Sequence, residues 1–246
     1  MRWRLLAAGF AAYALALAAT APATLADAGL RNASAGRLRL AQAQGTLWSG
    51  SGALEVRDAQ GHAGMAEPLA WRLRPGALLR ARIVYEFAIG PQPRPFAVSL
   101  GWSGIELADA EISVPAAALG LGVPRLAPLE LTGELQLRVA SLAVGRDGAR
   151  GSATLQWRGA GSALSPVAPL GDYELRVDSE GAVLRASVHT LQGPLQLDGD
   201  GTWANGRRPA FNAVARVPPQ LQQQLAPFLR LIAVERGDGG FDLRLE

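Results

Sequence analysis

Apolar and polar residues alternate along most of the chain beyond position 36. In the stretch 69–73, for example, Leu69, Trp71 and Leu73 are separated by Ala70 and Arg72. Side chains two residues apart lie on the same side of a β-strand, so each such run has one apolar and one polar face. The runs predicted to be strands are 37–40, 69–73, 83–89, 129–139, 152–157, 173–177, 182–189, 195–198, 211–217 and 241–245.

Glycine-rich junctions separate many of these runs. They lie at 145–148, 159–161, 199–201 and 237–240. Such junctions allow positive φ and are typical of hairpin turns and bulges. Clean alternation also favours antiparallel sheets with one solvated face over parallel strands buried on both faces. The predicted fold class is therefore all-β, with one or more elongated or curved antiparallel sheets.

Three stretches outside this alternation are predicted to be helical. Residues 24–34 are expected to form a short helix or linker, and residues 114–122 a single helical turn. Residues 218–234 begin with proline and carry apolar residues at helical spacing, which predicts a short C-terminal helix. Pro227 is expected to kink or split that helix.

The N-terminus carries two arginines, Arg2 and Arg4, before an uncharged apolar run at 5–21. The length of this run is at the lower limit for crossing a bilayer, and the arginines favour a cytoplasmic N-terminus. Small residues at alternate positions of 14–18 also fit the cleavage site of a signal peptide, and that alternative stays open. The predicted division is a cytoplasmic tail at 1–4, a transmembrane anchor at 5–21 and a periplasmic β-rich domain at 22–246.

Composition narrows the class of protein. Hydrophobic residues make up 49% of the chain and charged residues 18%, which excludes a disordered chain. The net charge is +3, and the basic residues are scattered arginines without clusters, so no nucleic-acid surface is predicted. The chain has no cysteine, which excludes disulfides and Cys-ligated zinc.

Residues that could carry catalysis are few and scattered. The two histidines, His62 and His189, have no partner at a recognised ligand spacing. The densest carboxylates, Glu106, Asp109 and Glu111, are interpreted as a solvated strand edge rather than an acid–base pair. No catalytic, cofactor-binding or metal site is therefore predicted.

The tryptophans are the remaining candidates for function. Most of them are expected to be core anchors, because large aromatic side chains bury much apolar area. Some could instead line a contact surface, as could the arginines beside them. The predicted interaction surface consists of Trp48, Ser49, Trp71, Arg72 and Arg74.

A weak internal repeat involves the phrase Gly-x-(x)-Leu-x-Leu. The stretch 133–157 resembles the stretch 171–197 in the order of its Gly, Leu and Gln residues. This similarity predicts a duplication across 129–157 and 169–203. Chance similarity between Leu-rich strands is the alternative.

Three segments together are similar to protein N of the type II secretion pathway, the GspN family. The first, 22–52, ends in Gly-Thr-Leu-Trp-Ser-Gly-Ser-Gly; the second, 68–75, is Pro-Leu-Ala-Trp-Arg-Leu-Arg-Pro; the third is 169–203. The element around Trp48 followed by that around Trp71 is the most specific part. The resemblance spans essentially the whole chain.

The resemblance implies a single-pass inner-membrane protein with its bulk in the periplasm. It further implies a non-enzymatic component that helps to export folded proteins across the outer membrane through contacts with other secretion subunits. It supplies no catalytic residues. The strands are also distantly similar to the sheets of AsmA-type proteins, so an alternative is a periplasmic lipid-binding or lipid-transport module with 218–234 as a cap.

Overall fold

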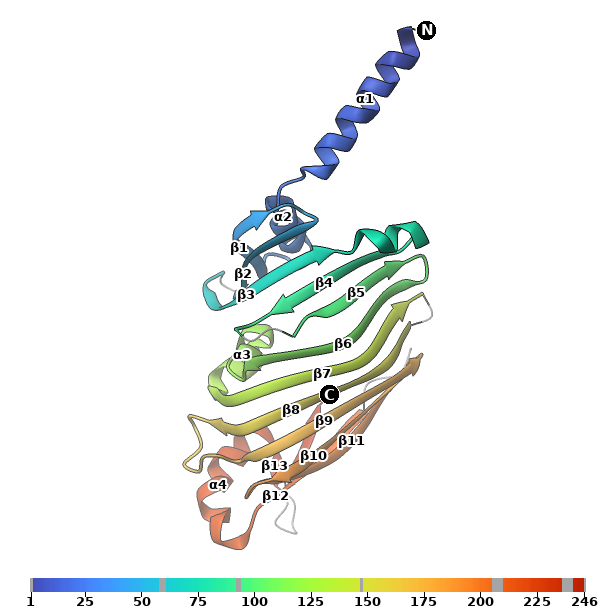
Figure 1. Ribbon diagram of the computed structural model, residues 1–246. Coiled ribbons are helices and arrows are strands. Elements are labelled where there is room, and N and C mark those ends of the chain that lie inside the picture. The colour runs from blue at the N-terminus through green and yellow to red at the C-terminus, as the bar shows by residue number, and fades with distance from the viewer. Residues whose placement is uncertain are drawn as a thin grey trace.

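The computed structural model describes residues 2–57, 61–91, 94–146, 148–204, 210–235 and 241–245. These residues form one sheet of fourteen strands (Figure 1). The strands are β1 (Leu38–Gly45), β2 (Ser49–Arg57), β3 (Ala63–Leu73), β4 (Ile83–Ile89), β5 (Phe96–Gly101), β6 (Gly104–Pro115), β7 (Leu131–Gly145), β8 (Gly148–Ser162), β9 (Gly171–Gly181), β10 (Val183–Gln192), β11 (Gln196–Ala204), β12 (Ala210–Arg216), β13 (Val234–Glu235) and β14 (Phe241–Leu245).

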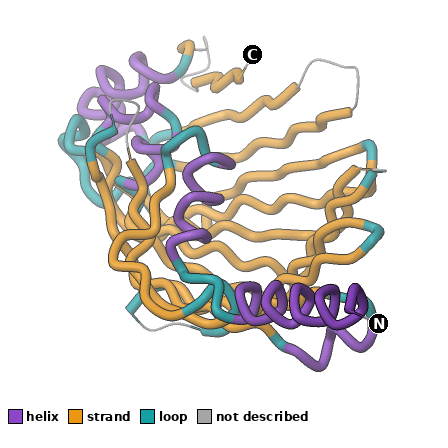
Figure 2. Tube along the Cα trace, turned by 90° about the horizontal axis from the view of Figure 1, so that it is seen from above, coloured by secondary structure: helices purple, strands orange, loops and turns teal. Residues whose placement is uncertain are grey.

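The sheet is an antiparallel meander in which β1 to β12 follow one another in chain order. Only the far edge departs from this order, because β14 lies between β12 and β13. Strand twist makes the strands fan out when the sheet is seen from above (Figure 2). The predicted all-β, antiparallel and elongated fold is confirmed, and the strands belong to one continuous sheet.

Helices precede the first strand, lie in connections between strands and precede the last two strands. They are α1 (Arg2–Ala19), α2 (Thr24–Ala33), α3 (Ala118–Gly122) and α4 (Pro219–Ile232), with the 3₁₀ helices η1 (Pro75–Arg80) and η2 (Pro124–Leu129). The predicted helices at 24–34 and 218–234 are confirmed. The predicted turn at 114–122 is shorter, because β6 continues to Pro115. Pro227 lies inside α4, which runs on to Ile232 without a break.

One face of the sheet is largely apolar. Directly opposed residues of antiparallel strands point to the same face. A row of such residues runs from β6 to β10 through Ile112, Leu137, Leu155, Leu175 and Val188. The neighbouring row on the other face, from β7 to β11, reads Gln136, Gln156, Glu174, His189 and Asp198. These are called the apolar face and the polar face below.

Helices cover the two ends of the apolar face. At the C-terminal end, Leu225, Phe228 and Leu229 of α4 pack on Ala215 and Phe241. α2 covers the other end, where Ala23 before the helix joins a cluster with two strand residues. Between the caps, a middle cluster around Phe96, Ala110 and Val139 consists of strand residues alone.

The glycine junctions have different roles in the sheet. Gly145 and Gly148 close the β7–β8 hairpin, and 159–161 contains a bulge, both as predicted. The turn predicted at 199–201 is wrong, because these residues pair within β11. A Cβ at Gly199 would lie 2.4 Å from the Cβ of Ala213, which is too close for two carbon atoms. Glycine at this position therefore leaves room for Ala213 on the neighbouring strand. Residues 237–240 lie outside the described part of the chain.

Helix α1 projects away from the β1 end of the sheet (Figure 1). Its apolar side chains, among them Leu6 and Phe10, are exposed. Within the described residues, none of the helices has the length and apolarity needed to cross a bilayer. The anchor at 5–21 and the duplication across 129–157 and 169–203 stay predictions.

Candidate functional site

The structure divides the predicted interaction surface between the two faces of the sheet. Trp71 points to the apolar face and is only 6% exposed, in a cluster with Ala23 and Leu40. Its indole Nε1 donates to the carbonyl oxygens of Thr46 and Leu47, both at 3.1 Å. Trp71 is therefore part of the core, and its ring is not available to a partner.

Ser49, Arg72 and Arg74 lie together on the polar face. Ser49 of β2 pairs with Arg72 of β3, which in turn pairs with Glu86 of β4. Arg74 forms an ion pair with the same Glu86. The hydrogen bond from Arg74 is the main reason that the pKa of the Glu86 carboxyl is lowered. These three residues, all exposed, are called the polar patch.

Trp48 links the first helix to this region. It lies in the β1–β2 turn, and its indole Nε1 donates to the carbonyl oxygen of Ala18 at 2.7 Å. Ala18 lies in the last turn of α1, where backbone carbonyls have no partner within the helix. The predicted residue Trp48 therefore positions α1 beside the strand that carries Ser49.

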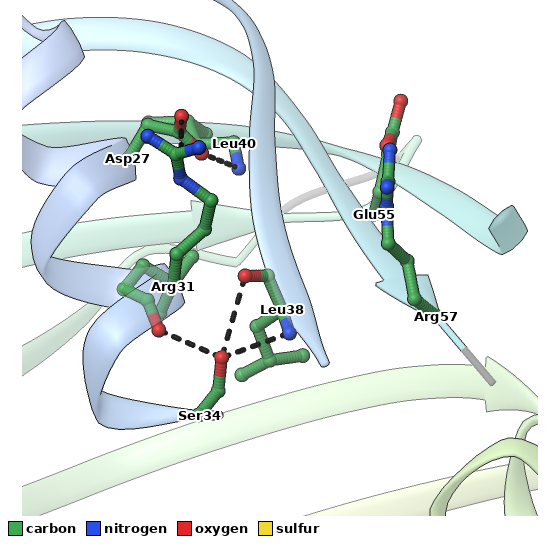
Figure 3. Close-up of polar contacts among 8 residues, drawn as sticks. Asp27, Arg31, Ser34, Leu38, Leu40, Glu55 and Arg57 are labelled. Atoms are coloured by element: carbon green, nitrogen blue, oxygen red, sulfur yellow. Dashed lines mark hydrogen bonds and ion pairs between the residues drawn. The ribbon is translucent and has the colours of Figure 1, made fainter. Parts of the chain in front are cut away.

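The junction of α2 and β1 is fixed by short polar contacts (Figure 3). The carboxylate of Asp27 accepts a hydrogen bond from the backbone N–H of Leu40 at 2.9 Å and forms an ion pair with Arg31 at 3.3 Å. The hydroxyl of Ser34 accepts from the N–H of Leu38 at 2.9 Å. These contacts pair backbone groups where the chain passes from helix to strand, and so hold α2 over the end of the sheet.

A buried carboxylate lies at the centre of the polar face. Glu174 of β9 accepts hydrogen bonds from Gln156 Nε2 at 2.8 Å and from Arg176 Nε at 2.7 Å. His189 Nε2 lies 3.5 Å from the same carboxylate. The hydrogen bond from Gln156 is the main cause of the lowered pKa of the Glu174 carboxyl. Sequence spacing missed the acidic partner of His189, because strand pairing brings the two residues together.

A second carboxylate is held in the same way. Glu111 of β6 accepts from Gln136 Nε2 at 2.5 Å and from Arg138 at 3.2 Å, and it pairs with Arg94. Hydrogen bonding by Arg138 is the first cause of the lowered pKa of the Glu111 carboxyl. The interpretation of this region as a strand edge is wrong, since β6 is an internal strand. Glu111 is largely covered, whereas Asp109 is exposed, as expected for a solvated position. Asp109 has φ 51° and has no partner in the β6–β7 pairing, between the pairs Ala108–Ser141 and Ala110–Val139.

The carboxylate of Glu174 is expected to make the stability of the fold depend on pH in the acid range. Its folded-state pKa is lowered, so its stabilising effect is present above the unfolded pKa of about 4.3 and is lost as the pH falls through the folded value. Glu174→Gln should therefore flatten the dependence of the urea midpoint on pH between about pH 7 and about pH 3. Glu180→Gln is the matched control, since Glu180 is an exposed residue of the same strand. Equal slopes for the wild type and Glu174→Gln would contradict this role.

The polar face is suited to cross-strand pairing. Its carboxylates are held by Arg and Gln donors, which keeps them ionised and fixes strand register. Among the described residues, no group of three or more His, Asp or Glu side chains could hold a metal ion. Among the described residues, the polar patch beside α1 and the apolar face between its helical caps are candidate surfaces for contacts.

Comparison with known proteins places this sheet in a family. The family model of type II secretion system (T2SS) protein N matches residues 36–244, from just before β1 into β14. Searches of curated proteins and of solved structures found no match. The match covers most of the chain and nearly all of the sheet. The chain therefore belongs to the type II secretion system protein N family.

Proposed function

We propose that this protein is a non-enzymatic component of the type II secretion machinery that is held at the inner membrane by α1 and binds other subunits through its periplasmic sheet. Family membership indicates involvement in type II secretion and an association with the cell envelope. The hydrogen bond from Trp48 to Ala18 supports the arrangement, because it joins the end of α1 to the strand that begins the polar patch. The exposed polar patch of Ser49, Arg72 and Arg74 supports the subunit-binding part of the proposal.

The tether is supported by the sequence and exposure of α1. Arg2 and Arg4 precede the apolar run, and arginines on that side favour retention of the N-terminus in the cytoplasm. Leu6 is 72% exposed and Phe10 is 75% exposed. Exposure of so many large apolar side chains is costly in water and favourable in a lipid environment. The sheet would then lie in the periplasm, with β1 nearest the membrane.

The test combines a deletion strain with site-specific crosslinking. Deletion is expected to leave folded exoproteins in the periplasm. A photo-crosslinking residue at Ser49 or Arg72 is expected to give adducts with inner-membrane or periplasmic subunits of the machinery. Glu180 provides the control position, since it lies on the same polar face on a distant strand and is also exposed.

Two results would contradict the proposal. One is normal exoprotein secretion, with normal assembly of the machinery, in the deletion strain. The other is an identical set of adducts from the polar patch and from Glu180. Full complementation by a chain that lacks 1–21 but carries a cleaved signal peptide would contradict the tether alone.

The apolar face favours a second candidate function, that of a periplasmic lipid-binding or lipid-transport module. Apolar clusters recur on this face near both of its ends and in its middle, and among the described residues the middle cluster consists of strand residues alone. An apolar surface of this kind suits acyl chains. Native mass spectrometry of the purified protein separates the candidates: a lipid module should carry bound phospholipid after detergent removal, whereas a subunit-binding protein should not.

A further inference from the structure

A row of exposed apolar side chains crosses one end of β4 to β7. Ile83, Leu100, Ile105 and Val144 are directly opposed on the apolar face, and each is 39–49% exposed. Trp102, in the β5–β6 turn, extends this row and is 94% exposed. Leu78 and Leu79 of η1, in the neighbouring β3–β4 connection, complete what is called the apolar rim. Leu79 is 92% exposed.

Exposure rises along each strand from the middle of the sheet toward this rim. On β5, Phe96 is 8% exposed and Leu100 is 39% exposed; on β6, Ala110 is 1% exposed and Ile105 is 49% exposed. The side chains of the apolar face thus cover one another in the middle of the sheet and are left exposed at this end. Contiguous exposed apolar residues of this kind mark an interaction site rather than chance surface composition.

Basic residues flank the rim. Arg80 ends η1, Arg82 precedes β4, and Arg146 lies in the β7–β8 turn; all three are exposed. Arg82 forms an ion pair with Glu106 of β6 at 3.7 Å. Arginine beside exposed Trp and Leu is the combination that binds the interface of an anionic bilayer, with the indole at the headgroup level.

We propose that the apolar rim contacts the surface of a phospholipid bilayer that carries anionic headgroups. Trp102 and Leu79 enter the headgroup region, and Arg80 and Arg146 bind headgroup phosphates. This inference rests on the proposed location of the domain beside the inner membrane. Contact at the rim adds a second attachment point besides α1 and so fixes the orientation of the sheet on the membrane.

Geometry favours a bilayer over a protein partner. The most exposed rim residues lie in turns and in a short 3₁₀ helix, which project beyond the strands rather than line a groove. Figure 1 also shows α1 leaving the sheet toward the side on which η1 lies. With α1 in the membrane, the apolar rim on the same side of the sheet can therefore contact the surface of that bilayer.

The absence of cysteine from the sequence allows single labels to test this contact. The full chain is reconstituted into vesicles of phosphatidylethanolamine and phosphatidylglycerol. Leu79→Cys and Trp102→Cys are each labelled with an environment-sensitive NBD fluorophore. The emission is expected to shift to the blue, to rise several-fold over the detergent-free aqueous value, and to be quenched by doxyl-labelled lipid.

Leu164→Cys is the matched control, because Leu164 is an exposed leucine in the connection from β8 to β9, at the opposite end of the strands (Figure 1). Its label should keep an aqueous spectrum. Phe10→Cys reports separately on α1: a quenched Phe10 label with unquenched rim labels would overturn the rim contact and leave the tether intact. A blue shift at the rim without doxyl quenching would also overturn the proposal and would indicate a protein contact such as a second copy of the chain.

Discussion

Trp71→Ala is expected to lower the free energy of unfolding by about 3–5 kcal/mol. The indole is nearly fully buried under α2, and its Nε1 donates to two backbone carbonyls. Truncation leaves a cavity and two carbonyls that lose a donor, and both effects destabilise the fold. Urea unfolding followed by circular dichroism measures the change, because the remaining tryptophans complicate fluorescence.

Trp71→Phe separates the two contributions. It keeps most of the apolar volume and removes the hydrogen bonds, so we expect a loss of about 1–3 kcal/mol, well below that of the alanine variant. Arg72→Ala is the control on the same strand, with a side chain on the polar face and an expected effect within about 0.5 kcal/mol. A Trp71→Ala effect as small as that of Arg72→Ala would contradict the core position and restore Trp71 to the interaction surface.

Leu225→Ala is expected to lower the free energy of unfolding by about 2–5 kcal/mol. Leu225 is 0% exposed and lies in the α4 cluster with Phe228, Leu229 and Ala215. Removing its side chain leaves a cavity between the helix and the sheet. Since α4 is amphipathic and short, packing against the sheet supplies most of its stability. Loss of this contact should therefore release the C-terminal cap as well as lower the unfolding midpoint.

Gln224→Ala, at an exposed position of the same helix, is the control and should change stability by less than about 0.5 kcal/mol. Hydrogen exchange measured on both variants shows where the effect lies. Faster exchange in α4 and in β12 to β14, with β1 to β3 unchanged, is expected for Leu225→Ala. A uniform increase across the sheet would instead show that the cap and the sheet unfold as one unit.

The two substitutions test opposite caps of one apolar face. Trp71 reports on the α2 end, and Leu225 reports on the α4 end. Their clusters share no residues, so the effects of the two substitutions should add. A coupling energy near zero in the double variant would show that the middle of the sheet separates two independent caps.

Many strands whose apolar side is visible in the sequence were predicted correctly, although β5 and β6 were not among the predicted runs. The alternation in 83–89 and 173–177, for instance, marks β4 and β9. Strand β2 was missed because its apolar-face positions include Gly50 and Gly52. A Cβ at Gly50 would lie 2.5 Å from the ring of Trp71, and a Cβ at Gly52 would lie 2.9 Å from Cδ1 of Leu40. The side chains of Trp71 and Leu40, on neighbouring strands, leave no room for a Cβ at these two positions. Glycine therefore stands where an apolar side chain would otherwise have shown the alternation of a strand.

The candidate site was predictable to a smaller extent. Ser49, Arg72 and Arg74 do gather on one face, since their spacing on adjacent strands is set by the β2–β3 pairing. The alternation around Trp71 placed its side chain on the apolar side of β3, but it did not show that β2 and the cluster with Ala23 and Leu40 would cover that position. The clusters around Glu111 and Glu174 were missed because their members come from different strands.

The sequence by itself determined that this protein is an antiparallel β protein with an apolar N-terminal segment and an amphipathic C-terminal helix. The periodicity of side chains and a proline at the start of a helix are local features of the sequence, so they can be recognised without knowledge of the fold. Only the tertiary structure decided that all strands join one sheet, that Trp71 is buried, that Glu174 meets His189 and that an apolar rim is left uncovered. Each of these depends on cross-strand register, which relates residues that are distant in the sequence.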